Sequence, residues 1–105
     1  MRDFYTNVYE IVDQIPFGRV TTYGAIANAL GVRKSSRLVG IAMNHSHCVA
    51  PALPSHRVVN RVGLLTGKHH FAGERLMEQL LVNEGIVIIN NQVQDFKRIF
   101  WDPLD

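Results

Sequence analysis

The sequence predicts a mainly helical, mixed α/β fold in one domain that spans residues 1–105. Three observations carry this prediction. Apolar residues recur at helical spacing in four segments, glycine or proline ends most of these segments, and a short hairpin pattern follows the last one. A chain of 105 residues is the size of one domain, and 47% hydrophobic residues are enough to build a core. This composition excludes a disordered chain.

Three helices are predicted in the N-terminal half. The first covers residues 4–15, where apolar side chains recur every three or four positions until Pro16 ends the pattern. The second begins after Thr22, which can cap it, and ends at Gly31. The third follows Ser35 or Ser36. The second helix is expected to bury Ile26, Ala29 and Leu30, and the third carries Leu38, Ile41 and Ala42 on one side.

The second and third helices are joined by the short turn of residues 30–35, which is typical of a helix-turn-helix. In that motif the second helix enters a groove of the DNA duplex, while basic residues beside it hold phosphates. Arg37 would stand near the start of this helix, with Arg33 and Lys34 in the turn. An ordinary helical hairpin in a small core fits the same pattern, so both interpretations stay open here.

The second half begins with a segment, residues 45–54, that is predicted to be irregular because of its two prolines. Short strands are expected at 57–59 and 62–65, and a helix at 71–83 that ends at Gly85. Residues 86–96 form a hairpin pattern around two asparagines, which tolerate the positive φ of a tight turn. A helical domain finished by a hairpin is typical of a winged helix-turn-helix. The fourth helix is expected to bury Leu76, Leu80 and Leu81.

Charge is segregated along the chain, although the net charge is only +2. Residues 14–73 contain no Asp or Glu but seven Lys or Arg and all five histidines, a local balance of +7. The remaining residues carry four bases and nine acids, a balance of −5. Such segregation indicates one face for a polyanion, of which nucleic acid is the commonest, although chance clustering is the alternative.

Other functional classes receive little support. The lone Cys48 excludes an internal disulfide framework, no secretory leader is evident, and the longest apolar stretches are too short to cross a bilayer. We therefore expect an intracellular protein without membrane contact. Four histidines and Cys48 follow no standard zinc spacing, and the positive surroundings disfavour a cation, so neither a metal nor a cofactor is expected. Aromatic residues 100–101 are expected to anchor the C-terminus by burial.

Ser55-His56 is the segment that carries chemistry. Adjacent Ser and His do not make a catalytic pair by themselves, because the two side chains must meet in space with a third group orienting the base. Taken alone, this segment fits a structural turn better than a nucleophile.

Four segments give it a context: GRVTTYG at residues 18–24, RLVGIAM at 37–43, PSHRVV at 54–59 and LLVNEG at 80–85. In this order and spacing they resemble the DNA-binding domain of the O6-alkylguanine-DNA alkyltransferases, over residues 3–88. Many of those transferases carry a separate N-terminal domain, which is not expected here. The resemblance implies binding of double-stranded DNA that carries O6-alkylguanine.

The main departure from the family is at position 55, where the transferases have the cysteine that accepts the alkyl group. A serine hydroxyl is a much weaker nucleophile than a thiolate, so the resemblance is to an alkyltransferase-like protein that binds the lesion without transferring the alkyl group. Alternatives that stay open are alkyl transfer or hydrolysis through Ser55, transfer through Cys48, and a winged-helix transcription regulator.

The resemblance also implies roles for individual residues. Tyr23 matches the tyrosine that presses on a phosphate and rotates the nucleotide outward, and Arg37 matches the arginine that fills the vacated stack; core packing and a simple phosphate contact are the respective alternatives. Ser55, His56 and Glu84 match the acceptor–His–Glu relay. Val58 matches a position whose backbone carbonyl helps to hold the base.

Further expectations follow from the family alone. We expect a monomer that presents the lesion to nucleotide excision repair proteins, in the cytoplasm of a bacterium beside its nucleoid or in the nucleus of a eukaryote. The segments 45–53 and 65–71 differ from the family, so no lesion size preference is transferred.

Overall fold

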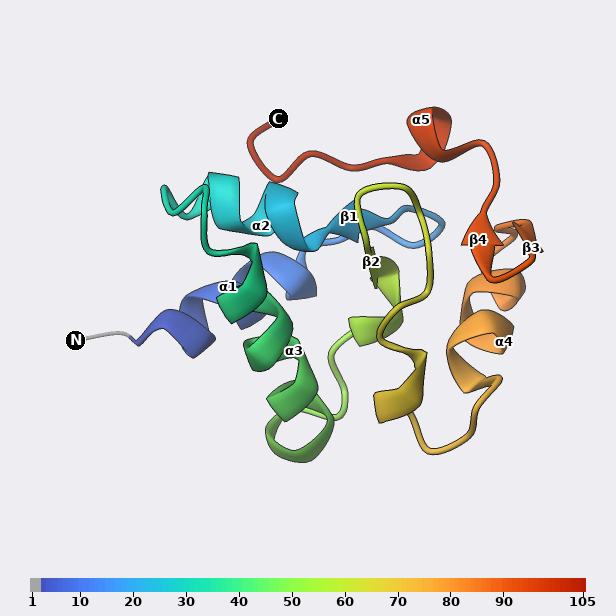
Figure 1. Cartoon of the computed structure of the whole chain (residues 1–105), viewed down its shortest axis with the longest axis horizontal. Coiled ribbons are helices and arrows are strands. Elements are labelled where there is room, and N and C mark those ends of the chain that lie inside the picture. The colour runs from blue at the N-terminus through green and yellow to red at the C-terminus, as the bar shows by residue number, and fades with distance from the viewer. Residues whose placement is uncertain (1–2) are drawn as a thin grey trace.

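Five helices and two small two-stranded sheets make up residues 3–105, the part of the chain that the computed structural model describes (Figure 1). The mainly helical, mixed α/β fold class predicted from the sequence is confirmed. The helices are α1 Phe4–Asp13, α2 Tyr23–Ala29, α3 Ser36–Val49, α4 Leu76–Asn83 and α5 Phe96–Ile99. The strands are β1 Thr21–Thr22, β2 Val58–Val59, β3 Ile88–Ile89 and β4 Gln92–Val93, and short 3₁₀ turns lie at Ser55–Arg57 and Lys68–His70.

Helix α1 confirms the first prediction and provides one wall of the N-terminal core. Its start is capped by Asp3, whose carboxylate accepts a hydrogen bond of 2.8 Å from the Thr6 amide. Val8, Val12 and Ile15 follow the helical period and are buried. Against them pack the inner faces of α2 and α3.

Helices α2 and α3 lie against each other, as a helix-turn-helix requires. Thr22 caps α2 as predicted, since its hydroxyl accepts a hydrogen bond of 3.0 Å from the Ala25 amide, and Gly31 takes the positive φ of 77° that leads into the turn. Within α2, Ile26 and Ala27 are buried, whereas the predicted Ala29 and Leu30 are only half-buried.

The predictions for α3 need two corrections. The helix continues to Val49, so residues 45–49 are not irregular; Pro51 restricts its own position and the residue before it, and leaves the turns further back free to be helical. Its buried face also differs from the predicted one. The core takes Val39, Ala42, Met43 and Ser46, while Leu38 and Ile41 are 50% and 39% exposed.

A parallel pairing of β1 with β2 joins distant segments of the chain, with Thr21 opposite Val58 and Thr22 opposite Val59. This pairing holds the start of α2 close to the Ser55–Arg57 turn. The strand predicted at 57–59 is thus confirmed for its last two residues. The strand predicted at 62–65 is wrong, because the Asn60 side chain accepts the amides of Val62 and Leu64 and folds these residues into a turn.

The predicted helix at 71–83 begins only at Leu76. Phe71 has extended backbone angles, and its ring packs against His47. The residues just before α4 therefore pack against α3 rather than extend the helix. Met77 and Leu81 are buried, whereas Leu76 and Leu80 are half-buried. The hairpin β3–β4 is confirmed in a shorter form, and its two turn residues, Asn90 and Asn91, have φ of 51° and 65°.

The C-terminal segment returns across the molecule to the N-terminal half (Figure 1). Phe100 forms a bridge with Val20, and the Trp101 amide donates to the Val20 carbonyl at 2.7 Å. The Arg19 guanidinium donates to the carbonyls of Ile99 and Phe100. Trp101 packs on the N-terminal core, which confirms the predicted anchor. Within residues 3–105, no helix combines the length and the apolar character needed to cross a membrane.

Candidate nucleic-acid interface

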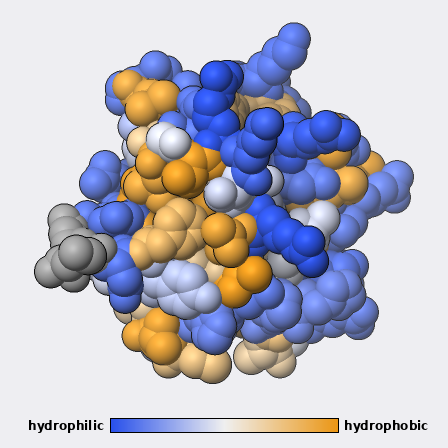
Figure 2. Space-filling view, turned by 60° about the vertical axis from the view of Figure 1, so that its left-hand side comes forward, coloured by the Kyte–Doolittle hydropathy of each residue, from blue (hydrophilic) through white to orange (hydrophobic). Residues whose placement is uncertain are grey.

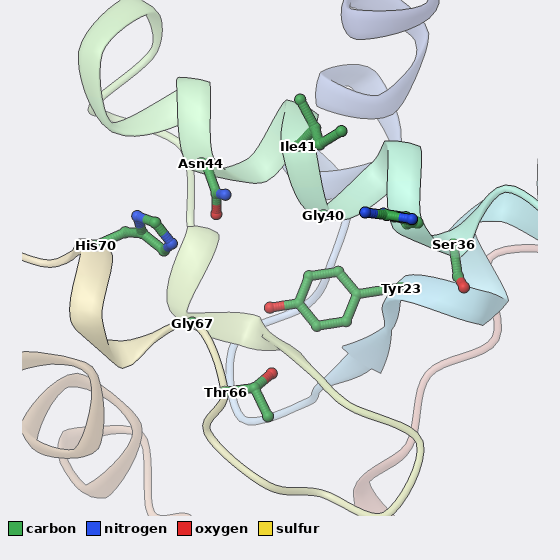
Figure 3. Close-up of a pocket in the computed structure, with 9 residues that line it drawn as sticks. Tyr23, Ser36, Gly40, Ile41, Asn44, Thr66, Gly67 and His70 are labelled. Atoms are coloured by element: carbon green, nitrogen blue, oxygen red, sulfur yellow. The ribbon is translucent and has the colours of Figure 1, made fainter.

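An open groove of about 460 Å³ lies between α3, the start of α2 and the turn before residue 68 (Figure 3). In Figure 3 the ring of Tyr23 lies at its centre, with α3 on one side and Thr66 on the other, and its hydroxyl points toward Gly67. The residues that line it are Tyr23, Ser36, Arg37, Gly40, Ile41, Asn44, Thr66, Gly67 and His70.

Tyr23 is held in place at this centre. Its hydroxyl makes a hydrogen bond with Thr66, and a Cβ atom at Gly67 would lie only 3.1 Å from the tyrosine oxygen. Burial raises the pKa of Tyr23 above its ordinary value, although the Thr66 hydrogen bond acts in the opposite direction. The phenol is therefore neutral at physiological pH and can approach an anion without repulsion.

Arg33, Lys34 and Arg37 are exposed at the turn between α2 and α3 and at the start of α3. None of the three forms an ion pair with any residue that the structure describes. On the side of the molecule seen in Figure 2, hydrophobic side chains gather near the middle of the face, with hydrophilic ones around them. The exposed surface thus combines these cations with apolar residues such as Leu38 and Ile41. Cations can bind the phosphates of a nucleic acid, while apolar side chains can contact base edges in its groove.

A second cavity of about 370 Å³ adjoins the first, since His70 lines both. Ser55 and His56 lie on its polar side. The other walls are apolar or aromatic and come from the end of α3, the segment after it, residues 71–72 and α4. They comprise His47, Pro51, Leu53, Phe71, Ala72, Leu76 and Leu80.

The hydroxyl of Ser55 has a fixed hydrogen-bond direction. Its oxygen lies 2.9 Å from that of Ser46, and the Ser46 hydroxyl donates to the Met43 carbonyl at 2.6 Å. A serine carries one hydroxyl proton, and a carbonyl only accepts, so Ser46 has no proton left for Ser55. Ser55 is therefore the donor to Ser46, and its oxygen faces the cavity as an acceptor only. None of the described hydrogen bonds joins Ser55 to His56.

His56 is instead bonded to Glu84, with 2.5 Å between Nε2 and the carboxylate. The Arg57 guanidinium binds both carboxylate oxygens, at 2.9 and 3.0 Å, and the Gly18 amide donates to one of them at 2.7 Å. The Glu84 side chain is 5% exposed. Burial alone would raise the pKa of Glu84, but these hydrogen bonds from Gly18, His56 and Arg57 more than offset it and hold the pKa below the ordinary value.

Val58 follows this turn in β2 with its side chain in the core, so only its backbone is near the site. Cys48 lies on the last turn of α3, is exposed and lines neither cavity. His47 packs edge-on against Phe71 with 4.5 Å between ring centroids and stacks with His70 at 6.4 Å. Burial, and then the neighbouring His70, lowers the pKa of His47.

The fold thus brings Tyr23 and Arg37 to one groove and Ser55 and His56 to the cavity beside it. The sequence did not reveal Ser46 or His70. Ser46 has no motif around it, and only the register of the buried face of α3 identifies it. His70 was considered as a metal ligand and as part of the segment 65–71 that differs from the family, and its position between two cavities depends on the irregular segment before α4.

Comparisons with known proteins agree with this geometry. Residues 3–86 match the model of the family described as 6-O-methylguanine DNA methyltransferase, DNA binding domain. Alkyltransferase-like protein 1 of Schizosaccharomyces pombe is 37% identical over 107 residues, which cover 98% of each chain. The DNA base-flipping protein of Escherichia coli is 35% identical over 101 residues, covering 94% of this chain and 74% of that protein.

A solved structure gives the same result in three dimensions. The crystal structure of S. pombe Atl1 in complex with damaged DNA containing O6-carboxymethylguanine superposes with a TM-score of 0.82 and 36% identity, over 96% of this chain and 98% of that one. The chain therefore belongs to the family of the 6-O-methylguanine DNA methyltransferase DNA-binding domains. Within that family it is similar, along nearly its whole length, to an alkyltransferase-like protein, which confirms the resemblance seen in the four motifs.

Proposed function

We propose that this protein binds double-stranded DNA, rotates an O6-alkylguanine nucleotide out of the duplex and holds it without transferring the alkyl group. One observation carries this proposal: the groove with Tyr23 and Arg37 lies next to the cavity that contains Ser55, and His70 lines both. A guanine inside a duplex hides its O6 edge, so a pocket that recognises this edge needs the base outside the stack.

Each residue of the groove has a place in this process. Tyr23 is neutral and braced by Thr66, so it can press against a backbone phosphate. Arg37 is exposed and has no ionic partner among the described residues, and its planar guanidinium can stack on the bases that remain. Similarity to the DNA base-flipping protein of E. coli and to S. pombe Atl1 bound to damaged DNA supports base flipping and lesion binding, while the residue roles rest on the geometry of the groove.

The absence of alkyl transfer is proposed from the chemistry of Ser55. Nucleophilic attack needs a base that takes the proton of the attacking group. The Ser55 proton is directed to Ser46, and none of the described hydrogen bonds joins Ser55 to His56, the histidine beside it in the cavity. Ser55 then serves as an acceptor in the pocket, and His56 and Glu84 serve as its frame. After binding, the complex would be passed to nucleotide excision repair proteins, in the compartment that holds the genome.

The direct test is a titration of the protein with two duplexes that differ only in one O6-methylguanine. Unstacking costs a few kcal/mol and less for a damaged pair, so we expect about tenfold tighter binding of the damaged duplex at every salt concentration. Equal affinity for the two duplexes would contradict lesion recognition. A sequence-specific regulator would instead select a consensus from random duplexes.

A second experiment tests the enzyme alternatives. Intact-protein mass spectrometry after incubation with O6-methylguanine DNA should show an unchanged mass, and the recovered DNA should retain its lesion. A mass gain of one methyl group that disappears in Ser55→Ala or in Cys48→Ala would overturn the non-catalytic proposal and identify the acceptor. Loss of the lesion without a mass gain would indicate hydrolysis.

A further inference from the structure

A third depression, of about 520 Å³, lies between the Asn60 turn and α5. We name it the distal groove. It combines two cations with two aromatic rings, which face each other with 5.6 Å between their centroids. Apart from Thr22, which belongs to the motif at residues 18–24, its lining residues lie outside the four family motifs and outside the proposed lesion pocket. The residues that line it are Thr22, Arg61, Val62, Phe96, Lys97 and Phe100.

The distal groove is linked to the groove around Tyr23 by a row of shared lining residues. A smaller depression connects them: it shares Tyr23 and Ser36 with the groove of Figure 3 and Arg61 with the distal groove. Thr22, at the near end of the distal groove, directly precedes Tyr23. A long ligand in the groove around Tyr23 would therefore extend past Arg61 toward α5.

The charge of the distal groove is positive and unmatched. Arg61 and Lys97 are exposed, and neither forms an ion pair with any residue in the described part of the chain. The acidic residue nearest to Lys97 in the sequence, Asp95, is engaged with Arg98. Two free cations beside an apolar groove favour a ligand of negative charge.

The backbone turn that carries Arg61 is fixed by hydrogen bonds and packing. The Asn60 side chain accepts hydrogen bonds from Val62 and Leu64 at 3.0 and 2.8 Å and so closes the turn that carries Arg61. Gly63 has a φ of 85°, and a Cβ there would lie 3.3 Å from the Phe96 ring, so the turn packs directly on α5. The hairpin β3–β4 braces it from behind, because the Val93 amide donates to the Gly63 carbonyl at 2.9 Å.

We propose that the distal groove binds the sugar–phosphate backbone of the duplex beyond the nucleotides around the lesion. Arg61 and Lys97 would each bind a phosphate, and the apolar surface of Phe96 and Phe100 would lie against deoxyribose. The link to the first groove favours DNA over an acidic protein segment, since a duplex that lies on Tyr23 and Arg37 extends past the same surface. Such contacts carry no base preference and serve to position the duplex. This inference rests on the proposed function, since it extends the same DNA path.

The test compares the double variant Arg61→Gln, Lys97→Gln with the wild type on damaged and undamaged duplexes over a range of salt. Each phosphate contact contributes about 0.9 to the slope of log K against log[salt], so losing two should lower it by about 1.8. Affinity should fall about tenfold or more for both duplexes, while their ratio stays unchanged. Arg75→Gln, an exposed cation outside every groove described above and paired with Glu78, is the matched control and should leave the slope as it is.

Duplex length provides a second readout. The lesion is placed near one end of the duplex or near the other, so that the flank on one side is short. The wild type should lose affinity when the flank that would lie on the distal groove is the short one. The affinity of the double variant should be the same for both duplexes. If the double variant had the same salt slope and the same dependence on duplex length as the wild type, the distal groove would not be a DNA site, and an acidic protein segment would remain as its ligand. If the wild type bound the damaged and undamaged duplexes equally, the lesion proposal would fail. The change in salt slope would still show whether the distal groove binds DNA.

Discussion

Two regions of the molecule use charge in opposite ways. Around Glu84, a buried carboxylate is matched by the Arg57 guanidinium, His56 and a backbone amide. In the turn between α2 and α3 and at the start of α3, three cations are exposed to solvent and have no ionic partner in the described chain. All charges of the first region are paired within the protein, whereas the cations of the second are available to a ligand.

The difference indicates which charges serve the fold and which serve a ligand. A buried charge must be paired, because an unpaired one is costly, so the Glu84 cluster joins α4 to the Ser55–Arg57 turn and to the loop of Gly18. Exposed cations need no partner for stability and contribute little to it. A variant in the first region should therefore change folding, and a variant in the second should change binding.

The largest effect is expected for Glu84→Ala. It would leave the Arg57 guanidinium half-buried without its carboxylate, and breaking a buried pair of this kind costs about 3–5 kcal/mol of the free energy of unfolding. Urea unfolding at pH 7 measures it. Glu78→Ala removes the exposed ion pair with Arg75 on the same helix and, as the matched control, should cost less than about 1 kcal/mol.

The same cluster predicts a pH dependence of stability. The folded pKa of Glu84 is lowered, so its stabilisation is complete above the ordinary value of a glutamate, about 4.3, and is lost as the pH falls through the lowered folded value. The difference in unfolding free energy between wild type and Glu84→Gln should therefore be largest at neutral pH and close toward pH 3. A difference that grew on acidification would refute the paired carboxylate.

Arg37→Ala should give the largest effect in the open region. If the guanidinium fills the stack that the nucleotide leaves, its removal exposes a gap of unstacked bases worth a few kcal/mol, or about 30–100-fold in affinity for the damaged duplex. The undamaged duplex should lose about threefold, as expected for one phosphate contact. Fluorescence titration of both duplexes measures this ratio, and the unfolding free energy should stay within about 0.5 kcal/mol. If the affinity fell equally for both duplexes, Arg37 would only bind a phosphate and would not fill the stack.

Much of this comparison was predictable from the sequence. The acid-free segment indicated free cations, and four ordered motifs predicted the family and the residues Tyr23, Arg37 and Ser55. Helix α1, the Thr22 cap and the Asn90-Asn91 turn followed from local rules, because caps, helical periodicity and positive φ are decided by neighbours in the chain.

Most of the errors come from long-range packing. The segment before α4 is irregular because Phe71 packs on His47 from a different helix, whereas the turn at residues 62–65 is closed locally by the Asn60 side chain, a signal that the alternation of residues 62–65 does not contain. Leu38 and Ile41 face solvent because the core selects Val39 and Met43 instead. The hydroxyl direction of Ser55 depends on Ser46, nine residues away in the chain, and no spacing rule would have found it.

Tyr23→Ala should have a smaller effect than Arg37→Ala. The Tyr23 ring presses on the backbone but leaves the gap to be filled by Arg37, so we expect about a tenfold loss with the damaged duplex and little change with the undamaged one. Gly67→Ala is the matched control, since its Cβ would lie 3.1 Å from the tyrosine oxygen and displace the hydroxyl without removing the ring. A loss of a few-fold in this variant, measured by the same titration, would show that the position of the hydroxyl matters. If the Tyr23→Ala variant still preferred the lesion about tenfold, Tyr23 would have no part in the flipping step.

The smallest effects are expected for Arg33→Ala and Lys34→Ala, and they separate the two kinds of DNA contact. Both residues lie exposed in the turn before α3 and line neither cavity, so a phosphate is the DNA group that we expect them to contact. Each variant should lower the affinity about three- to tenfold for damaged and undamaged duplexes alike and flatten the salt slope by about 0.9. A change in the ratio between the duplexes would show that the turn reads the lesion. An unchanged slope would show that the DNA passes along α3 without touching this turn, because a cation that releases no counterion binds no phosphate.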